Sequence, residues 1–327
     1  MFNRRDFALS TLAASTLMAH GSVMAQTKTA WPTKPLRIVV GLAPGGLADV
    51  LVRIVQPHLT EALKQPVVVD NRGGAGGNVA GVEVVRNGSD GHTFLLVPST
   101  TESVNPTMFT SMPFDPQKDL RPVAQLANSQ LFLFVRSSLG VDTLEAFIAH
   151  AKKNPNALTY GSAGNGTTPH LAGELLKKSA GISATHAPYR GVAPAFQDLV
   201  AGTIDFAFGP ATIMPWVQQG KLKVLAVASR KRAAVLPDLR TFTEAGINDV
   251  FADSVFGVYA PTRASAEAVT RLNTEINKVL ARPDDKARFL EAGAEAIPLS
   301  PAEYSAQVQE EKRLFGAIVK ALDLKAN

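Results

Sequence analysis

Two glycine-rich turns hold the residues of this chain that are best suited to bind an anion. The first turn spans residues 41–49 and the second spans residues 161–170, and each follows an apolar run. Each turn is expected to open a helix, whose first N–H groups have no acceptor inside the helix and carry the positive end of its dipole. Glycine lets a ligand approach such groups closely. If the two turns face each other, the chain is a clamp for a small carboxylate.

The candidate ligand-binding residues lie mainly in these two turns. They are Ala43, Pro44, Gly45, Gly46, Ala48, Asp49, Ser99, Ser162, Ala163, Asn165, Gly166, Thr167, Thr168, His170 and Tyr189. The hydroxyl and amide groups of the second turn add donors beside the unpaired N–H groups. The first turn fits neither the G-x-G-x-x-G spacing of a dinucleotide site nor the Gly-Lys-Ser/Thr ending of a P-loop. We expect no cofactor and no metal.

Three of the candidates have two interpretations each. Asp49 can cap the helix that follows or receive an ammonium group of the ligand, and capping is the commoner fate. His170 can contact the ligand or be structural. Tyr189 can form a wall of the cleft and donate a hydrogen bond, or it can pack against the predicted helix 192–201 with its hydroxyl in water.

The first residues have the features of an export signal. Arg4 and Arg5 precede a weakly apolar stretch, and small or modest residues precede a cleavage site between Ala25 and Gln26. The paired arginines resemble a twin-arginine signal, and the general secretory route stays open as an alternative. We therefore expect the mature protein to lie outside the cytoplasm.

Composition excludes several classes of function. The chain has 327 residues and no cysteine, which excludes disulfides, thiol nucleophiles and thiolate metal sites. No later segment has the roughly 18 to 20 apolar residues of a membrane-spanning helix. Loss of residues 1–25 removes two arginines and one aspartate, so the formal charge falls from +5 to +4. Basic residues are scattered, with 230–232 as the one cluster, so we expect no nucleic-acid partner.

Short apolar runs alternate with helical patterns, which predicts an α/β fold with parallel or mixed sheets covered by helices on both faces. The predicted strands are 35–40, 66–69, 93–97, 131–135, 158–160, 204–208, 222–227 and 256–260. The predicted helices are 48–64, 78–87, 143–153, 168–179, 192–201, 213–219, 265–281, 284–292 and 301–321. The alternation pauses near 122–127, and a second boundary falls near 253–258. We expect a signal peptide at 1–25, a discontinuous first lobe of 26–127 plus 254–327, and a second lobe of 128–253.

The order of several motifs resembles a known family. The matching segments include Pro44-Gly45-Gly46 with Asp49, the run 65–78 and the second turn; the others are 31–32, 34–37, 90–93, 105–106, 113–116, 170–174, 188–191, 220–227 and 271–273. Together they resemble the Bug receptors, the periplasmic solute-binding proteins of tripartite tricarboxylate transporters. The resemblance implies a two-lobed, type II periplasmic-binding-protein fold with two hinge crossings. It also implies a small organic anion held between the lobes, mainly by backbone donors of the two turns.

The chain departs from the family pattern at residues that matter for the ligand. The family's first turn usually continues Gly-Gly-Gly-Thr-Asp, whereas Leu47 and Ala48 occupy two of these positions here. Gly209 lies in a segment, 208–212, where the family more often has Asp or Asn. These changes are expected to shrink or dry the cleft, so a citrate-like ligand does not follow from the resemblance.

We expect a hinged trap for a di- or tricarboxylate that delivers it, as a monomer, to the permease subunits of a membrane transporter. A receptor that docks on a membrane sensor is an alternative with the same ligand switch. A hydrolase with a triad of Ser162, His170 or His186, and Asp205 is a remote alternative, because the chain lacks a G-x-S-x-G elbow. We expect the protein not to be an enzyme.

Overall fold

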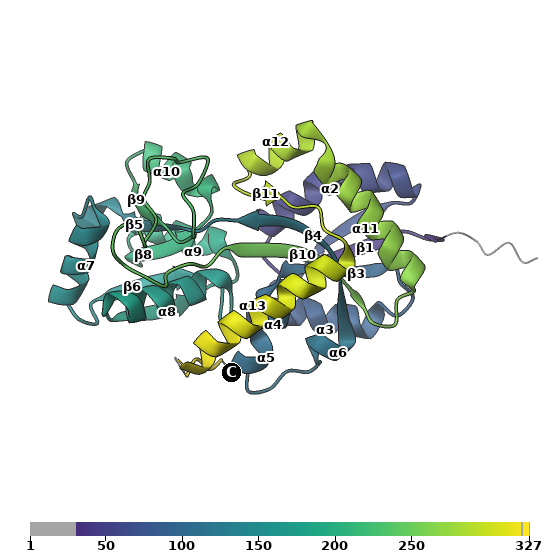
Figure 1. The fold of residues 1–327 in the computed structure, drawn as a ribbon, viewed down its shortest axis with the longest axis horizontal. Coiled ribbons are helices and arrows are strands. Elements are labelled where there is room, and N and C mark those ends of the chain that lie inside the picture. The colour runs from purple at the N-terminus through teal and green to yellow at the C-terminus, as the bar shows by residue number, and fades with distance from the viewer. Residues whose placement is uncertain (1–30, 322, 327) are drawn as a thin grey trace, which may run out of the picture.

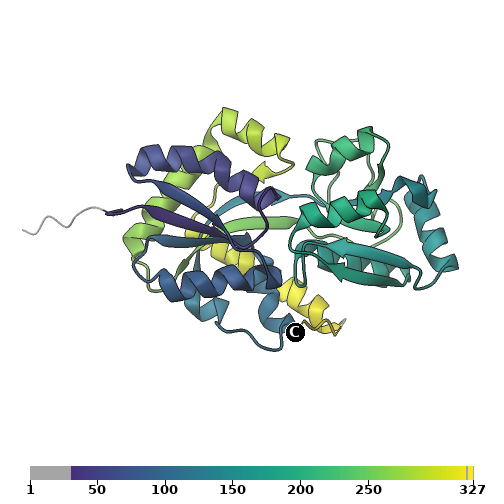
Figure 2. The ribbon, with the colours of Figure 1, turned by 180° about the vertical axis from the view of Figure 1, so that it is seen from behind.

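The chain folds into two lobes, each built on its own β-sheet (Figures 1 and 2). This computed structural model describes residues 31–321 and 323–326. The predicted signal peptide and its cleavage site at Ala25 and Gln26 lie outside the described residues. Within the described residues, none of the helices combines the length and the apolar character needed to cross a bilayer.

The first lobe contains a six-stranded mixed sheet in the order β11-β4-β10-β3-β1-β2. Its strands are β1 (Leu36–Val40), β2 (Val67–Asn71), β3 (Thr93–Pro98), β4 (Leu120–Ser129), β10 (Ser254–Pro261) and β11 (Glu295–Ala296). The first three strands are parallel, and β10 pairs antiparallel with both β3 and β4. The apolar runs of β1 and β3 are buried on both faces because helices cover both sides of the sheet.

The helices of the first lobe place their apolar residues against the sheet. One face is covered by α2 (Leu47–Leu63), α11 (Ala266–Ala281) and α12 (Pro283–Glu291). The other is covered by α3 (Asn78–Asn87) and the start of α13 (Pro301–Ala321). The helices α4 (Thr100–Ser103), α5 (Asn105–Met108), α6 (Pro116–Asp119) and the short turn η1 (Ala75–Gly77) complete the lobe. Spacing at Leu51, Ile54, Val55 and Leu59 explains why one stripe of α2 is buried.

The second lobe contains a five-stranded sheet in the order β7-β6-β8-β5-β9. Its strands are β5 (Phe132–Arg136), β6 (Leu158–Ser162), β7 (Ala184–Pro188), β8 (Phe206–Gly209) and β9 (Leu222–Val227). On one face lie α7 (Leu144–Lys153) and α8 (Thr168–Ala180); on the other lie α9 (Val192–Ala201) and α10 (Met214–Gln218). The short turns η2 (Ser137–Leu139) and η3 (Ala211–Ile213) lie between these elements. Rings of Phe147 and Phe206 meet edge to face in the core, with centroids 5.2 Å apart.

The α/β fold with two mixed sheets and two hinge crossings is confirmed, and β4 is the main element that the sequence pattern missed. The pause predicted at 122–127 is part of a ten-residue strand that pairs with β10 along its length. Pro122, Gln125 and Asn128 break the apolar run, so its pattern is that of a loop. Burial of Gln125 in the sheet is a tertiary effect that local pattern does not report.

Two crossings connect the lobes. The first runs from the end of β4 at Ser129 to β5, and the second returns from β9 to β10 through residues 228–253. Along these crossings the main chains are hydrogen-bonded: Ala228 N donates to Leu131 O at 2.7 Å, and Ala252 N donates to Ala228 O at 2.9 Å. We call the strand ends and residues 128–131 and 252–254 the hinge.

The last helix does more than cover the first lobe. Tyr304 and Val308, near its start, pack on the first sheet. Near its end, Phe315 and Val319 share an apolar cluster with Leu171 of α8 in the second lobe. Figure 1 shows α13 running from the first sheet toward the second lobe. The helix therefore contacts both lobes close to the hinge.

Candidate functional site

The first glycine-rich turn is held in shape by its own aspartate. The carboxylate of Asp49 accepts a hydrogen bond from Gly45 N at 3.0 Å and binds Arg53 at 3.0 Å. Burial acts to raise the pKa of Asp49, but the hydrogen bonds from Arg53 and Gly45 outweigh it and keep the pKa below its usual range. Asp49 thus stabilises the turn at the start of α2 and is satisfied within the chain.

The turn leaves several N–H groups without an acceptor at the start of α2. Gly46 precedes α2, so the N–H groups of Leu47, Ala48 and Asp49 have no acceptor within the helix. Leu47 is half-buried and Ala48 is buried. Pro44 and Gly45 are exposed, and Gly45 has a positive φ of 76° that suits glycine.

The second turn is held by two stacked histidines. Ser162 Oγ lies 2.7 Å from His186 Nε2, and Gly166 N donates to His170 Nδ1 at 3.2 Å. The two imidazole rings stack with centroids 4.0 Å apart. Burial lowers the pKa of His170 to about 4 and that of His186 to about 3, so both rings are neutral near pH 7. A neutral ring can accept the Gly166 hydrogen bond, which assigns His170 a structural role.

The hydroxyls of the second turn mostly bond within the protein. Thr167 Oγ1 donates to Gly164 O at 2.7 Å, which tightens the turn before α8. Ser254 Oγ, in the hinge, donates to Thr168 Oγ1 at 3.2 Å. Because Thr168 belongs to the second lobe and Ser254 begins β10 of the first lobe, this bond fixes the start of α8 against the hinge.

Each turn is in close contact with the opposite lobe. A Cβ atom at Gly191 would lie 3.2 Å from Ala43 Cβ, and one at Gly76 would lie 2.6 Å from Asn165 O. Residues of both lobes are thus in close contact, and the lobes are closed. The glycines at these points have positive φ values, so they supply both the backbone geometry and the space for closure.

Between the turns lies a cavity with an inner and an outer compartment. The inner one has a volume of about 20 Å3, comparable to a single water, and touches the hinge. It is lined by Leu42, Leu47, Pro98, Ser129, Leu131, Ala163, Thr167, Thr168, Pro169, Val192, Pro210, Ser254 and Phe256. No charged residue belongs to this lining, and most of its side chains are apolar.

The outer compartment is larger, at about 330 Å3, and glycines form much of its lining, so main-chain atoms border it. It is lined by Gly41, Leu42, residues 73–77, Val79, Ala163, Tyr189 and Arg190. Leu42 and Ala163 line both compartments, so the two are adjacent. Arg190 is the charged member of this lining, and no ion pair holds it within the described part of the chain.

Comparison with known proteins identifies the family. A model of the tripartite tricarboxylate transporter family receptor matches residues 51–324. The chain belongs to this receptor family. It is similar to BugT of Bordetella pertussis, with 30% identity over 298 residues, which cover 90% of this chain and 91% of BugT.

Two similar solved structures are those of proteins with a dicarboxylate. Rpa4515 of R. palustris with adipate is 33% identical, has a TM-score of 0.86, and the match covers 90% of this chain and 98% of Rpa4515. MatC of Rhodopseudomonas palustris with bound malate is 28% identical with a TM-score of 0.83, covering 88% of this chain and 100% of MatC. The solved relatives include proteins described as periplasmic, so the family is one of periplasmic binding proteins.

Several candidate residues of this family member lie apart from the cavity lining. The Ser99 hydroxyl donates to the Glu311 carboxylate of α13, and Asn165 approaches Gly76 through its main chain. Tyr189 lines the outer compartment, while its hydroxyl donates to Asp198 Oδ2 at 2.7 Å. Burial raises the pKa of Tyr189 to about 12. Among the candidates, Ala163, Thr167, Thr168 and Tyr189 line the two compartments.

The structure adds lining residues that sequence reasoning did not single out. Residues 73–77 were noted as a family segment only, although their glycines already indicated a close approach of main chain to something. Leu42 lies in the first turn and Arg190 in the family segment 188–191, but neither was selected as a binding residue, and Val192 gave no signal of its own. Pro210 lies within the segment 208–212 that departs from the family, and it lines the inner compartment as that departure suggested.

The residues of the hypothetical triad do not form a relay. Ser162 and His186 are in contact, but Ser162 is only 1% exposed. The Asp205 carboxylate binds Arg136 at 2.9 Å and accepts from Thr159 N at 2.7 Å. No carboxylate hydrogen-bonds to His186 among the residues described. In residues 31–321 and 323–326, no group of His, Asp and Glu side chains is arranged to hold a metal ion.

Proposed function

We propose that the protein captures a small organic carboxylate between its lobes and delivers it to the permease subunits of a tripartite transporter. The observation that carries this proposal is that both glycine-rich turns border one inter-lobe cavity. Family membership and relatives solved with adipate and malate support it.

Main-chain donors are the proposed anchors of the carboxylate. The first N–H groups of α2 and α8 have no acceptor within their helices, and Leu47 and Thr168 at these helix starts line the inner compartment. Each charge-assisted hydrogen bond from such a group to a carboxylate contributes about 1.5–3 kcal/mol net. A handful of them, less the cost of association, reaches micromolar affinity, near about −8 kcal/mol. Because neutral N–H dipoles replace a buried cation, the empty site carries no unpaired charge in its inner compartment.

We propose further that the ligand is a dicarboxylate with an unsubstituted hydrocarbon body. Leu47 and Pro210 present an apolar wall at the inner compartment, which is too small to hold the whole ligand. This wall favours methylene groups packed against it and leaves a hydroxyl buried there without a partner. An unpaired buried hydroxyl costs about 1–3 kcal/mol. Arg190, at the outer compartment, is positioned to attract a second carboxylate. The lining of the two compartments therefore suits adipate better than malate or citrate.

The remaining features of the proposal concern the cell. We propose export to the periplasm with cleavage after Ala25, a monomeric mature protein, and no enzymatic activity. The lobes are proposed to comprise residues 26–127 with 254–327, and 128–253. Docking on a membrane sensor stays the alternative to docking on a permease, and capture of the loaded or empty protein by each membrane partner separates them.

Titration calorimetry with Ala163 variants tests ligand capture. Ala163 borders both compartments, so Ala163→Asp places a negative charge beside the proposed carboxylate, and Ala163→Asn adds similar bulk without charge. We expect unmodified protein to bind adipate, Ala163→Asn to bind it more weakly, and Ala163→Asp to show no heat. Ala157→Asp, at an exposed site of the same lobe, is the matched control and should bind normally. Equal binding by all four proteins would refute the site.

A further inference from the structure

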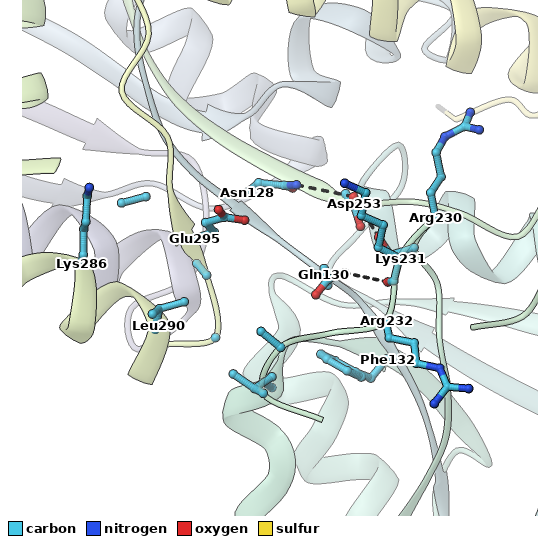
Figure 3. A pocket seen from close by; sticks show the side chains of 17 residues that line it. Asn128, Gln130, Phe132, Arg230, Lys231, Arg232, Asp253, Lys286, Leu290 and Glu295 are labelled. Carbon is cyan, nitrogen blue, oxygen red and sulfur yellow. Dashed lines mark hydrogen bonds between the residues drawn. The ribbon is translucent and has the colours of Figure 1, made fainter. Parts of the chain in front are cut away.

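A second and larger cavity lies between the lobes behind the hinge. Its volume is about 660 Å3, and Figure 3 shows residues of both lobes around it. The first lobe contributes the end of α12 and the segment that leads to β11, including Lys286, Leu290 and Glu295. The second lobe contributes residues 229–235 of the return crossing. We call this space the rear cavity.

The rear cavity and the ligand cavity share the hinge as a common wall. Asn128, Gln130 and Asp253 line the rear cavity, whereas their neighbours Ser129, Leu131 and Ser254 line the inner ligand compartment. Successive residues of an extended chain point to opposite sides, which explains the alternation. In the same way, Ala211 lines the rear cavity and its neighbour Pro210 lines the inner ligand compartment. The two spaces therefore lie on opposite sides of the pivot between the lobes.

In this closed form, the two walls of the rear cavity already touch at their ends nearest the hinge. Ser129 Oγ donates to Gly293 O at 2.9 Å, and a Cβ at Gly293 would lie 3.1 Å from Ala211 N in the second lobe. Residues farther along the same walls, such as Leu290 and Val235, border open space instead. A rotation that parts the ligand-binding turns brings these outer parts of the rear walls toward each other.

The two rear walls have complementary surfaces. Val235 and Leu290 are 48% and 49% exposed, and they belong to the few large apolar side chains exposed on the described chain. They lie on opposite lobes, as do Glu295 and Lys231. Neither Glu295 nor Lys231 has an ion-pair partner among the described residues, while Arg232 binds Glu244 and Arg230 stacks on Phe251. Leu290 with Val235 and Glu295 with Lys231 are therefore the matching pairs of the two walls, while Lys286 of the first-lobe wall has no opposite charge facing it among the residues of this lining.

Polar atoms of the shared wall are also unsatisfied in this closed form. Asp253 Oδ1 and Asn128 Oδ1 are buried and have no donor in the described part of the chain. Buried acceptors without donors cost free energy, so the closed form leaves this side of the hinge less favourable.

From this arrangement we propose that the walls of the rear cavity form an interface that stabilises the open, ligand-free protein. When the ligand turns part, Leu290 packs against Val235 and Glu295 pairs with Lys231. Ligand-driven closure breaks these contacts. Part of the free energy of ligand binding is therefore needed to break them, which weakens the measured affinity. This inference rests on the proposed function, which is ligand capture by lobe closure. It goes beyond that function because it names the contacts that stabilise the open form against closure.

Weakening this interface should tighten ligand binding. In Leu290→Ser the open form loses its apolar contact, and we expect the Kd for adipate to fall by about three- to tenfold. Val68→Ser is the control, because Val68 is an exposed apolar residue, 51% exposed, that borders none of these cavities. It should leave the Kd unchanged.

A charge exchange tests the polar half of the interface. Glu295→Lys places two ammonium groups on opposite walls and should also lower the Kd. The double variant Glu295→Lys with Lys231→Glu restores opposite charges in reversed order and should return the Kd toward that of the unmodified protein. A merely local effect of either substitution would not be reversed in the double variant.

Small-angle X-ray scattering of the ligand-free proteins gives an independent measurement. We expect an extended, open form for the unmodified protein and Val68→Ser, and a shift toward the closed dimensions for Leu290→Ser and Glu295→Lys. A ligand-free protein that is already closed, or variants with unchanged scattering and unchanged or weaker binding, would overturn the inference. If no carboxylate binds any of the proteins, the proposed function fails, while the scattering comparison still decides on the interface.

Discussion

Replacing Leu47 with serine should change which dicarboxylate the protein prefers. Leu47 is the first residue of α2, is half-buried, and lines the inner compartment opposite Thr168 and Pro169 of the second lobe. Truncating a fully buried leucine costs about 2–5 kcal/mol. Because Leu47 is only half-buried, we expect a loss of about 1.4 kcal/mol in contacts with a hydrocarbon ligand, which is about tenfold in Kd. The serine hydroxyl should at the same time offer a partner to a hydroxylated acid.

Titration calorimetry with adipate and malate measures the change as a ratio. The adipate Kd should rise about tenfold in Leu47→Ser, the malate Kd should rise less or fall, and the preference for adipate should shrink accordingly. Leu139→Ser, at a half-buried leucine of the second lobe that borders neither compartment, controls for lost apolar packing. An unmodified protein that binds malate as tightly as adipate would refute the argument from apolar lining. So would a Leu47→Ser protein with an unchanged ratio.

Two further predictions follow from the turns. Gly76→Ala should weaken carboxylate binding by at least about tenfold, because its Cβ would lie 2.6 Å from Asn165 O of the other lobe and obstruct closure. Gly140→Ala is its matched control, since Gly140 has a similar positive φ of 74° with no atom near the added Cβ; equal affinities for the two variants in calorimetry would contradict this account. The buried histidines should make stability depend on pH. With folded pKa values of about 4 and about 3 against an unperturbed 6.5, the unfolded chain binds more protons, so their contribution is fully present above pH 6.5 and is lost as the pH falls toward 4. Thermal unfolding should show a falling Tm over this range and a shallower fall in His170→Gln, and identical pH profiles would argue against the histidine stack as the cause.

Local sequence pattern predicted most of the elements but not the contacts between lobes. The strands around the two turns and the long helices have strong periodicity, so their positions were predictable within a few residues. β4 was missed because its register is set by pairing with β10, and not by an apolar run of its own. The predicted helix 301–321 was assigned to the first lobe, whereas Phe315 and Val319 of α13 also contact Leu171 of the second lobe. Such a contact depends on chain segments distant in sequence.

The candidate site was also predictable only in part. The two turns were predictable because glycine, helix starts and polar residues mark main-chain donors locally. The roles of the individual side chains were harder to predict. His170 accepts a hydrogen bond from Gly166 N, and Asp49 accepts one from Gly45 N, so both side chains stabilise their own turns. Residues 73–77 and Arg190 become part of the site only when closure brings the lobes together.

The ligand cavity and the rear cavity together explain how affinity and specificity can vary separately. Main-chain donors of the two turns recognise any carboxylate, so side chains such as Leu47 and Pro210 are left to select the body between the carboxylates. The measured affinity also contains the cost of closing the lobes, and that cost depends on residues that never touch the ligand. If Leu290 and Glu295 stabilise the open form, their substitution changes the Kd of every ligand by the same factor. Substitution of Leu47 changes the ratio between ligands instead. A panel of carboxylates therefore distinguishes the two kinds of residue within one experiment.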